Sequence, residues 1–110
     1  MTRPATLPDP PYYSVVFASL RTPVDDGYSD TSELMFELVQ QQPGFLAADS
    51  VRGADGLGIT VAYFRDEESI RAWKAHAEHA LAQKLGRERW YESYALHIGK
   101  VERAYRFDRE

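Results

Sequence analysis

The chain has 110 residues, of which 44% are apolar and 27% are charged, with a net charge of −4. This length and composition are typical of one folded domain. The chain has no block of Lys and Arg residues, which argues against a nucleic-acid partner. No cysteine is present, which excludes disulfides, thiolate metal sites and a cysteine nucleophile. No apolar run approaches the about 18 residues of a membrane span, so we expect no membrane partner and a cytoplasmic protein.

Residues 1–11 are Pro-rich and lack the apolar core of a signal peptide, so we predict a flexible arm followed by a domain over 12–107. The β-branched and aromatic run 12–21 (YYSVVFASLR) predicts the first strand. Pro23 and the Asp-Asp-Gly of 25–27 then end it.

A helix is expected over about 29–41. Ser29 or Asp30 would cap its start, and Glu33 follows Asp30 at the capping-box spacing. Pro43 and Gly44 would end this segment.

Two further strands are predicted at 45–52 and 57–64, joined by Gly-Ala-Asp-Gly at 53–56. A linker of this composition is typical of a hairpin, so these strands should pair antiparallel. A second helix over 67–85 would be capped by Asp66 and ended by Gly86, and a last strand would follow over about 93–106.

The resulting order, β-α-β-β-α-β, is that of an α+β ferredoxin-like domain, with four antiparallel strands and both helices on one face. Residues 15–18 are consecutively apolar, however, and 57–64 places apolar side chains on both faces of its strand. Two helices can cover only one face. We therefore predict a homodimer whose sheets pack together, burying roughly 800 Å² on each partner.

The second helix carries the strongest candidate site. At about 100° per residue, one sector collects its core-facing side chains, Ile70, Trp73, Ala77, Ala80 and Leu81. His76 lies at the edge of that sector and His79 lies farther toward solvent. These two histidines have the spacing to share a metal, but no third ligand accompanies them, so we expect no metal site. Instead, His76 can act as a base or a hydrogen-bond donor.

Arginines and aromatic residues follow this helix: Arg87, Arg89, Trp90, Tyr91 and Tyr94. They can line a pocket for a flat aromatic ligand by stacking and cation–π contact. They can equally cover one end of the sheet while pairing with Glu88 and Glu92.

Six segments together resemble the antibiotic biosynthesis monooxygenase (ABM) domain, in the branch related to haem-degrading monooxygenases. They are 42–45 (QPGF), 58–64 (GITVAYF), 72–79 (AWKAHAEH), 82–87 (AQKLGR), 90–91 (WY) and 101–105 (VERAY). The resemblance covers about 12–107. It implies a dimeric α/β barrel, in agreement with the two-sided apolar sheet.

The resemblance implies an oxygenase that needs no cofactor and oxidises a small phenol- or quinol-type aromatic with O₂. His76 would be its acid/base, and Arg87 would stabilise anionic oxygen. The residues expected to bind the substrate are Trp73, Tyr63, Phe64, His79, Trp90 and Tyr94.

Two other functions remain open. Some relatives bind and cleave haem through a histidine of the second helix, which would match His76 or His79. That pattern also uses an asparagine, and this sequence has none, while Phe64 stands where many relatives carry Trp. The other alternative is a dimer that binds a small molecule without catalysis.

Overall fold

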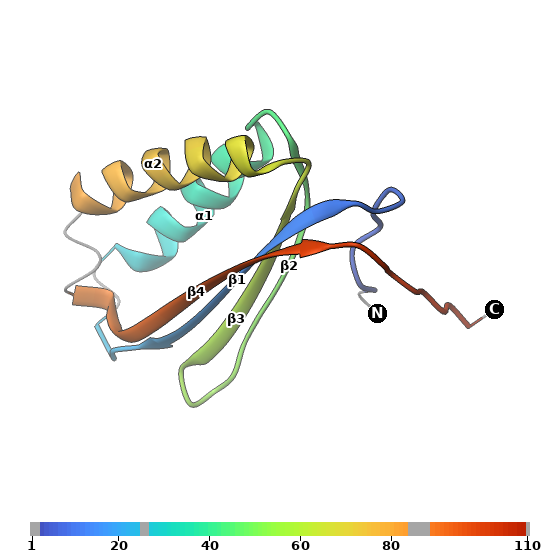
Figure 1. The fold of residues 1–110 in the computed structure, drawn as a ribbon. Helices are drawn as coiled ribbons and strands as arrows, with labels where there is room; N and C mark the ends of the chain where they lie inside the picture. Colours follow the sequence, from blue (N-terminus) through green and yellow to red (C-terminus); the bar gives the residue numbers. More distant parts are fainter. Residues whose placement is uncertain (1–2, 25–26, 84–88, 110) are drawn as a thin grey trace.

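A computed structural model describes residues 3–24, 27–83 and 89–109, and for 78–83 it describes the backbone alone. The elements, in chain order, are β1 (Tyr12–Arg21), α1 (Tyr28–Gln40), β2 (Phe45–Arg52), β3 (Leu57–Phe64), α2 (Glu67–Gln83) and β4 (Tyr91–Val101). They form one antiparallel sheet of order β2-β3-β1-β4 with both helices on the same side (Figure 1). The predicted α+β ferredoxin-like fold is confirmed.

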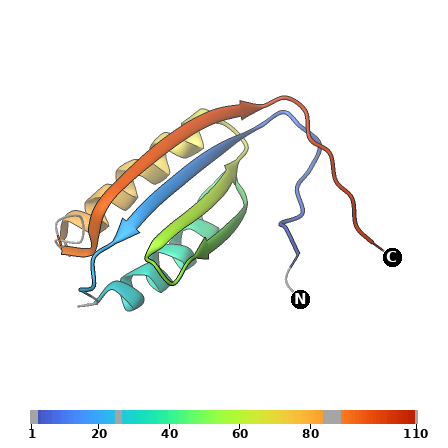
Figure 2. The same cartoon turned by 90° about the horizontal axis from the view of Figure 1, so that it is seen from below.

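The long strands β1 and β4 lie side by side, and β4 is one edge of the sheet. Seen from below, the sheet lies in front of both helices (Figure 2). Neither helix is long and apolar enough, over the described residues, to cross a membrane.

The predicted bounds of β1, β2 and β3 are confirmed, but two other predictions are wrong. Helix α1 begins at Tyr28. The residue before it, Gly27, has a left-handed backbone conformation with a φ of 84°, and no side chain caps the helix. Ser29 and Asp30 therefore lie inside its first turn. The last strand runs from Tyr91 to Val101, and not over 93–106, because its partner β1 begins at Tyr12 and offers no pairing beyond Val101.

The predicted cap of α2 is confirmed. The Asp66 carboxylate accepts hydrogen bonds from the Ser69 backbone N–H at 2.8 Å and from the Ser69 hydroxyl at 2.6 Å. The first of these bonds satisfies a backbone donor that the first turn of a helix leaves open. Gly86, the predicted end of this helix, lies outside the described residues.

The hydrophobic core lies between the sheet and the helices. Val39 of α1, Ile70 of α2 and Phe64 of β3 form its buried centre. Half-buried side chains pack around this centre: Tyr13, Val15, Phe45, Ala62 and Trp73. The Phe64 side chain is 0% exposed and meets Phe45 edge to face, with ring centroids 5.7 Å apart.

The opposite face of the sheet carries no helix and is apolar. Val51, Leu57 and Ile59 point to this open face and are 72%, 52% and 44% exposed. Val16 and Val61 pair beside them on the same face. The structure thus bears out a sheet with two apolar faces, while the homodimer expected to cover the second face stays a prediction.

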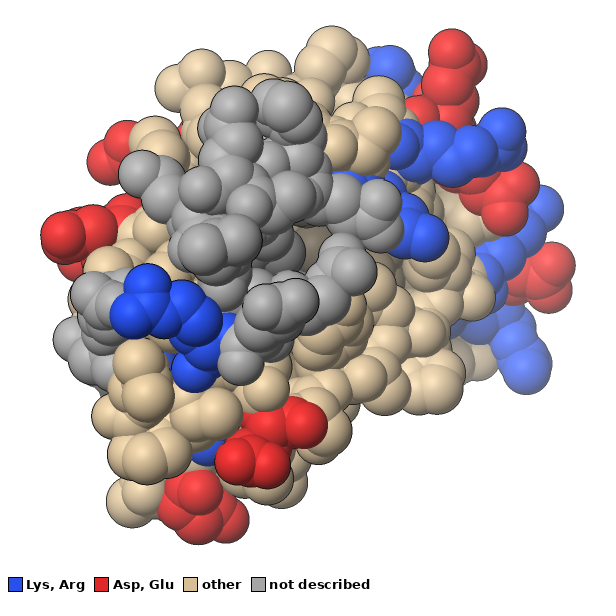
Figure 3. Space-filling model, turned by 90° about the vertical axis from the view of Figure 1, so that its left-hand side faces the viewer, with Lys and Arg blue, Asp and Glu red and all other residues tan. Residues whose placement is uncertain are grey.

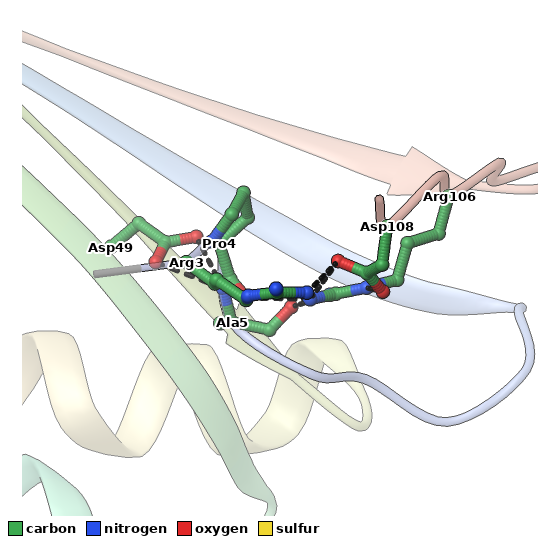
Figure 4. Close-up of polar contacts among 6 residues, drawn as sticks. All are labelled: Arg3, Pro4, Ala5, Asp49, Arg106 and Asp108. Carbon is green, nitrogen blue, oxygen red and sulfur yellow. Dashed lines mark hydrogen bonds and ion pairs between the residues drawn. The ribbon is translucent and has the colours of Figure 1, made fainter. Parts of the chain in front are cut away.

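The chain ends meet beneath the open face (Figure 4). The Ala5 N–H donates to the Asp49 carboxylate at 3.0 Å, which ties the arm to β2. Arg106 donates to the carbonyl oxygens of Ala5 at 2.8 Å and Pro4 at 3.2 Å. An ion pair of 3.2 Å joins Arg3 to Asp108. The division into a flexible arm over 1–11 and a domain over 12–107 stays a prediction.

Candidate functional site

The helix-facing surface of the sheet has two chemically different halves. Near the start of β1 it is apolar and buried, because Phe64, Ala62 and Val15 meet the helices there. Toward the end of β1, small, hydroxylated and charged residues of β1, β2 and β3 stand beside aromatic and aliphatic ones. One cross-strand row reads Leu96, Phe17, Thr60, Ser50, and the next reads Tyr94, Ser19, Gly58, Arg52.

Three side chains of β4 on this same side of the sheet remain partly exposed. Tyr94 is 40% exposed, Leu96 43% and Ile98 52%, although their pairing partners Ser19, Phe17 and Val15 face the helices. Aromatic and aliphatic side chains with this exposure beside a core form a surface suited to a flat apolar ligand.

A cluster of aromatic rings lies at this end of the sheet, beside the polar residues. Phe17 contacts Tyr94 and Tyr91, with ring centroids 5.5 and 5.7 Å apart, and Tyr91 lies 5.8 Å from Tyr94. Helix α1 adds Tyr28, whose ring centroid lies 6.0 Å from that of Tyr91. Three separate elements therefore supply one aromatic cluster.

The Arg52 guanidinium lies flat over the sheet at the edge of this cluster. It donates to the Ser19 hydroxyl at 2.8 Å, to the Ser19 carbonyl at 3.2 Å and to the Gly56 carbonyl. A Cβ at Gly58 would lie 2.7 Å from the guanidinium carbon, so the missing side chain makes the space for this arrangement. Arg52 also reaches the Tyr28 hydroxyl at 3.5 Å.

Two positive charges act on Tyr28. The Arg21 guanidinium carbon lies 3.3 Å from the centroid of the Tyr28 ring, in cation–π geometry. Burial alone would raise the pKa of Tyr28. Hydrogen bonds with Tyr91 and Ser32, together with the charges of Arg52 and Arg21, bring the pKa below its ordinary value. Burial raises the pKa of Tyr91, and its interaction with Tyr28 raises it further. Tyr28 is therefore the more acidic member of this pair.

Helix α2 carries two predicted site residues whose side chains the structure describes, Trp73 and His76. The His76 ring stacks on the Trp73 ring at a centroid distance of 5.7 Å and an interplanar angle of 26°. Trp73 is half-buried against the core, whereas His76 is exposed. The His79 side chain and the whole of Arg87 lie outside the described residues.

The remaining predicted site residues do not share one location. Tyr63 pairs with Ser14 on the open face, where it contacts Tyr12 at 5.7 Å, and therefore lies across the sheet from Trp73. Phe64 is enclosed in the core. Trp90 is 2% exposed and packs edge to face on Tyr28 at 5.7 Å, while Tyr94 belongs to the aromatic cluster.

Charge and metal ligands are dispersed. On the end of the molecule in Figure 3, basic and acidic side chains of the described residues are interspersed with uncharged ones. Among the side chains that the structure describes, those of residues 3–24, 27–77 and 89–109, no three His, Asp or Glu gather as a metal-binding group.

The sequence reasoning missed Tyr28 and Arg52. No usable signal gave the position of Arg52, because the four-residue linker 53–56 would place it opposite Leu57, whereas in the structure it pairs with Gly58. A glycine facing an arginine on the core side leaves room for its guanidinium. Nothing local marks Tyr28, which reaches the cluster only through the placement of α1.

These features define an α+β ferredoxin-like domain with an accessible aromatic surface between sheet and helices. The chain belongs to the antibiotic biosynthesis monooxygenase family, whose model matches residues 15–85. It is 50% identical over 96 residues to the uncharacterized protein YqjZ of Bacillus subtilis, covering 87% of this chain and 84% of that protein.

Two further similarities are more distant. A segment of 43 residues is 37% identical to jasmonate monooxygenase ABM of Pyricularia oryzae, covering 39% of this chain and 20% of that protein. SnoaB of Streptomyces nogalater, a cofactor-independent oxygenase, has the same fold. Its TM-score is 0.70 at 12% identity, over 86% of this chain and 97% of SnoaB.

Proposed function

We propose that this protein is a monooxygenase that needs no cofactor and oxidises a small phenol- or quinol-type aromatic with O₂. The observation that carries the proposal is the partly exposed helix side of β4, where the aromatic Tyr94 and the aliphatic Leu96 and Ile98 lie beside polar residues of β1 and β2. Membership of the monooxygenase family and the common fold with a cofactor-independent oxygenase support it.

The chemistry requires the protein to favour the ionised substrate. Removing a proton gives an electron-rich anion that transfers electrons to O₂, which the neutral phenol does poorly. At an activated ring methylene, the balanced result is a carbonyl that holds one oxygen atom and a water that holds the other. The two C–H bonds supply all four electrons, so no external reductant is needed.

We assign the proton transfer to His76, an exposed imidazole held against Trp73 at the rim of the helix side. Trp73 and Tyr94 would contact the aromatic ring of the substrate. His79 and Arg87 remain candidates for the same surface. Phe64 and Trp90 would support the site by packing, since both are buried.

The test is O₂ uptake with a panel of quinols and fused-ring phenols, comparing wild type with His76→Ala. We expect turnover by wild type and a loss of about 10²–10⁴-fold in the variant, the usual contribution of a general base. Equal rates would remove His76 from the mechanism, and no uptake with any substrate would favour a binding protein.

A haemin titration tests the other catalytic alternative. The cofactor-free proposal predicts no saturable shift of the Soret band with wild type. A saturable shift that is lost in His76→Ala would instead identify this histidine as a haem ligand and contradict the proposal.

We also propose that the open face is covered by a second copy of the chain. The exposed side chains Val51, Leu57 and Ile59 support this, because water-exposed apolar groups on a sheet gain free energy when another sheet covers them. Tyr63 would then lie near the interface between the two sheets.

A further inference from the structure

We propose that Arg52 and Tyr28 together bind the ionised oxygen of the aromatic substrate, at the polar end of the helix side. This inference rests on the proposed function and deepens it. Neither residue is among those expected from the sequence, where Arg87 was the candidate for this role.

The first support is that Arg52 is held in place by neutral groups. Its guanidinium donates to the Ser19 hydroxyl, the Ser19 carbonyl and the Gly56 carbonyl, and Gly58 provides the space beneath it. No carboxylate of the described residues forms an ion pair with Arg52. Its positive charge is therefore fixed in position but not neutralised, which is what an anion site requires.

The second support is the hydroxyl beside that charge. The Tyr28 oxygen lies 3.5 Å from the Arg52 guanidinium nitrogen, and the Arg21 guanidinium lies against the Tyr28 ring. The hydrogen bond with Tyr91, the charges of Arg52 and Arg21 and the hydrogen bond with Ser32 together outweigh burial and lower the pKa of Tyr28. A more acidic hydroxyl donates a stronger hydrogen bond to an anionic oxygen.

The third support is the ring surface next to these polar groups. In the same cross-strand row, Tyr94 stands at one end and Arg52 at the other, with the small residues Ser19 and Gly58 between them. A flat aromatic ligand lying along this row would contact Tyr94 with its ring and present a phenolic oxygen to Arg52 and Tyr28. The Arg52 guanidinium fills the space over Gly58 and Ser19, so the ring would lie beside it, on the exposed side chain of Tyr94.

The step that this site would favour is a simple proton loss. The substrate O–H bond breaks, its electron pair stays on the oxygen, and the proton passes to the base or to water. Arg52 and Tyr28 then hold the anion by charge and by hydrogen bonding. The bound phenol should therefore have a lower pKa than the free one.

The probe that tests this is para-nitrophenol, whose ionised form absorbs visible light. Adding wild-type protein in buffer more acidic than the free probe's pKa should increase phenolate absorbance saturably. Arg52→Gln should weaken phenolate binding about tenfold, since one charged hydrogen bond is lost. Tyr28→Phe should weaken it by a smaller factor, and Gly58→Ala should act like Arg52→Gln because it displaces the guanidinium.

Arg103→Gln is the matched control, because it removes one exposed positive charge beyond the far end of β4. It should leave the probe's titration unchanged, and circular dichroism with thermal melting checks that every variant is folded. If Gly58→Ala melts at a lower temperature than wild type, Arg52→Lys takes its place. This variant keeps the positive charge but loses the planar guanidinium and its paired N–H donors.

The outcomes separate this site from the oxygenase activity. A saturable signal that Arg52→Gln abolishes, with no O₂ uptake on any substrate, supports the site and rejects the proposed function. O₂ uptake by wild type with no change of probe binding in Arg52→Gln overturns the site and leaves the function standing. No probe signal from wild type also overturns the site.

Discussion

At the scale of single residues, Phe64 and Gly44 show how strongly this small core constrains its sequence. Phe64 is enclosed by side chains from the sheet and from both helices. Gly44 has a φ of 84°, and a Cβ there would lie 2.0 Å from the Ser69 hydroxyl oxygen and 2.7 Å from its Cβ. One position requires a large ring and the other requires no side chain at all.

Replacing Phe64 with Ala should reduce the free energy of unfolding by about 3–5 kcal/mol, because it removes a buried ring and leaves a cavity. Urea denaturation measures the change. Phe107→Ala is the control, since that ring is 80% exposed, and it should shift stability by less than about 0.5 kcal/mol. Equal effects of the two substitutions would contradict the placement of Phe64 in the core.

Replacing Gly44 with Ala should cost about 2 kcal/mol or more, because a left-handed backbone conformation and a steric overlap are combined. Gly99→Ala provides the comparison. Its new Cβ would meet only the Ser14 hydroxyl oxygen, at 4.0 Å. Urea denaturation should therefore give Gly99→Ala a stability close to wild type, and a similar loss for both variants would count against the tight contact at Gly44.

At the scale of elements, local signals located the strands well because they depend on neighbours in the chain. The hairpin linker at 53–56 and the β-branched strands on either side of it determine where β2 and β3 begin and end. Asp66 marks the start of α2 for the same reason. The start of α1 was misplaced because two polar residues imitate a cap, while Gly27 actually ends the loop.

The cap of α2 should make stability depend on pH. Hydrogen bonds from the Ser69 hydroxyl and N–H lower the pKa of Asp66 below its ordinary value. The stabilisation is therefore present above the unfolded-state pKa, about 3.9, and is lost as pH falls through the lower folded-state pKa. Over this acid range, the urea midpoint of wild type should fall more steeply than that of Asp66→Asn.

Asparagine keeps a capping oxygen but cannot titrate, so this comparison isolates the carboxylate. Asp55→Asn, in the hairpin linker, is the control for losing one acidic charge and should follow wild type. Identical acid dependence of wild type and Asp66→Asn would exclude a contribution from this cap.

At the scale of the whole molecule, the open face is the surface through which we expect two copies of the chain to associate. It exposes apolar side chains of β2 and β3, and the terminal segments meet beneath it at the end near Asp49. A homodimer through this face is the expected result. Introducing a charge there should oppose association, because the charge would be desolvated against the partner.

We therefore expect Ile59→Glu to sediment as a monomer at concentrations where wild type is a dimer. Ile59 is 44% exposed in the isolated subunit, so the variant should keep its fold. Leu34→Glu, on the outside of α1 and 46% exposed, is the control and should remain dimeric. A wild type that stays monomeric under these conditions would refute the assembly.

The candidate site was only partly predictable. The contact between Trp73 and His76 was predictable because helical spacing alone brings residues three apart onto neighbouring positions, and the two rings stack; their role in a site stays a prediction. Tyr63 and Phe64 were assigned to one pocket, but adjacent residues of a strand point to opposite faces. Strand alternation argues against that grouping even before the fold is known.

The sequence by itself determined the order of elements, both apolar faces of the sheet and the cap of α2, since periodicity and turn residues act over a few positions. Only the tertiary structure decided that Tyr28 lies beside Arg52 and belongs to the same aromatic cluster as Tyr94. They come from α1, β2 and β4, and their proximity depends on strand register and on where a helix crosses the sheet. Those relations arise from packing between distant segments, which no short stretch of the chain encodes.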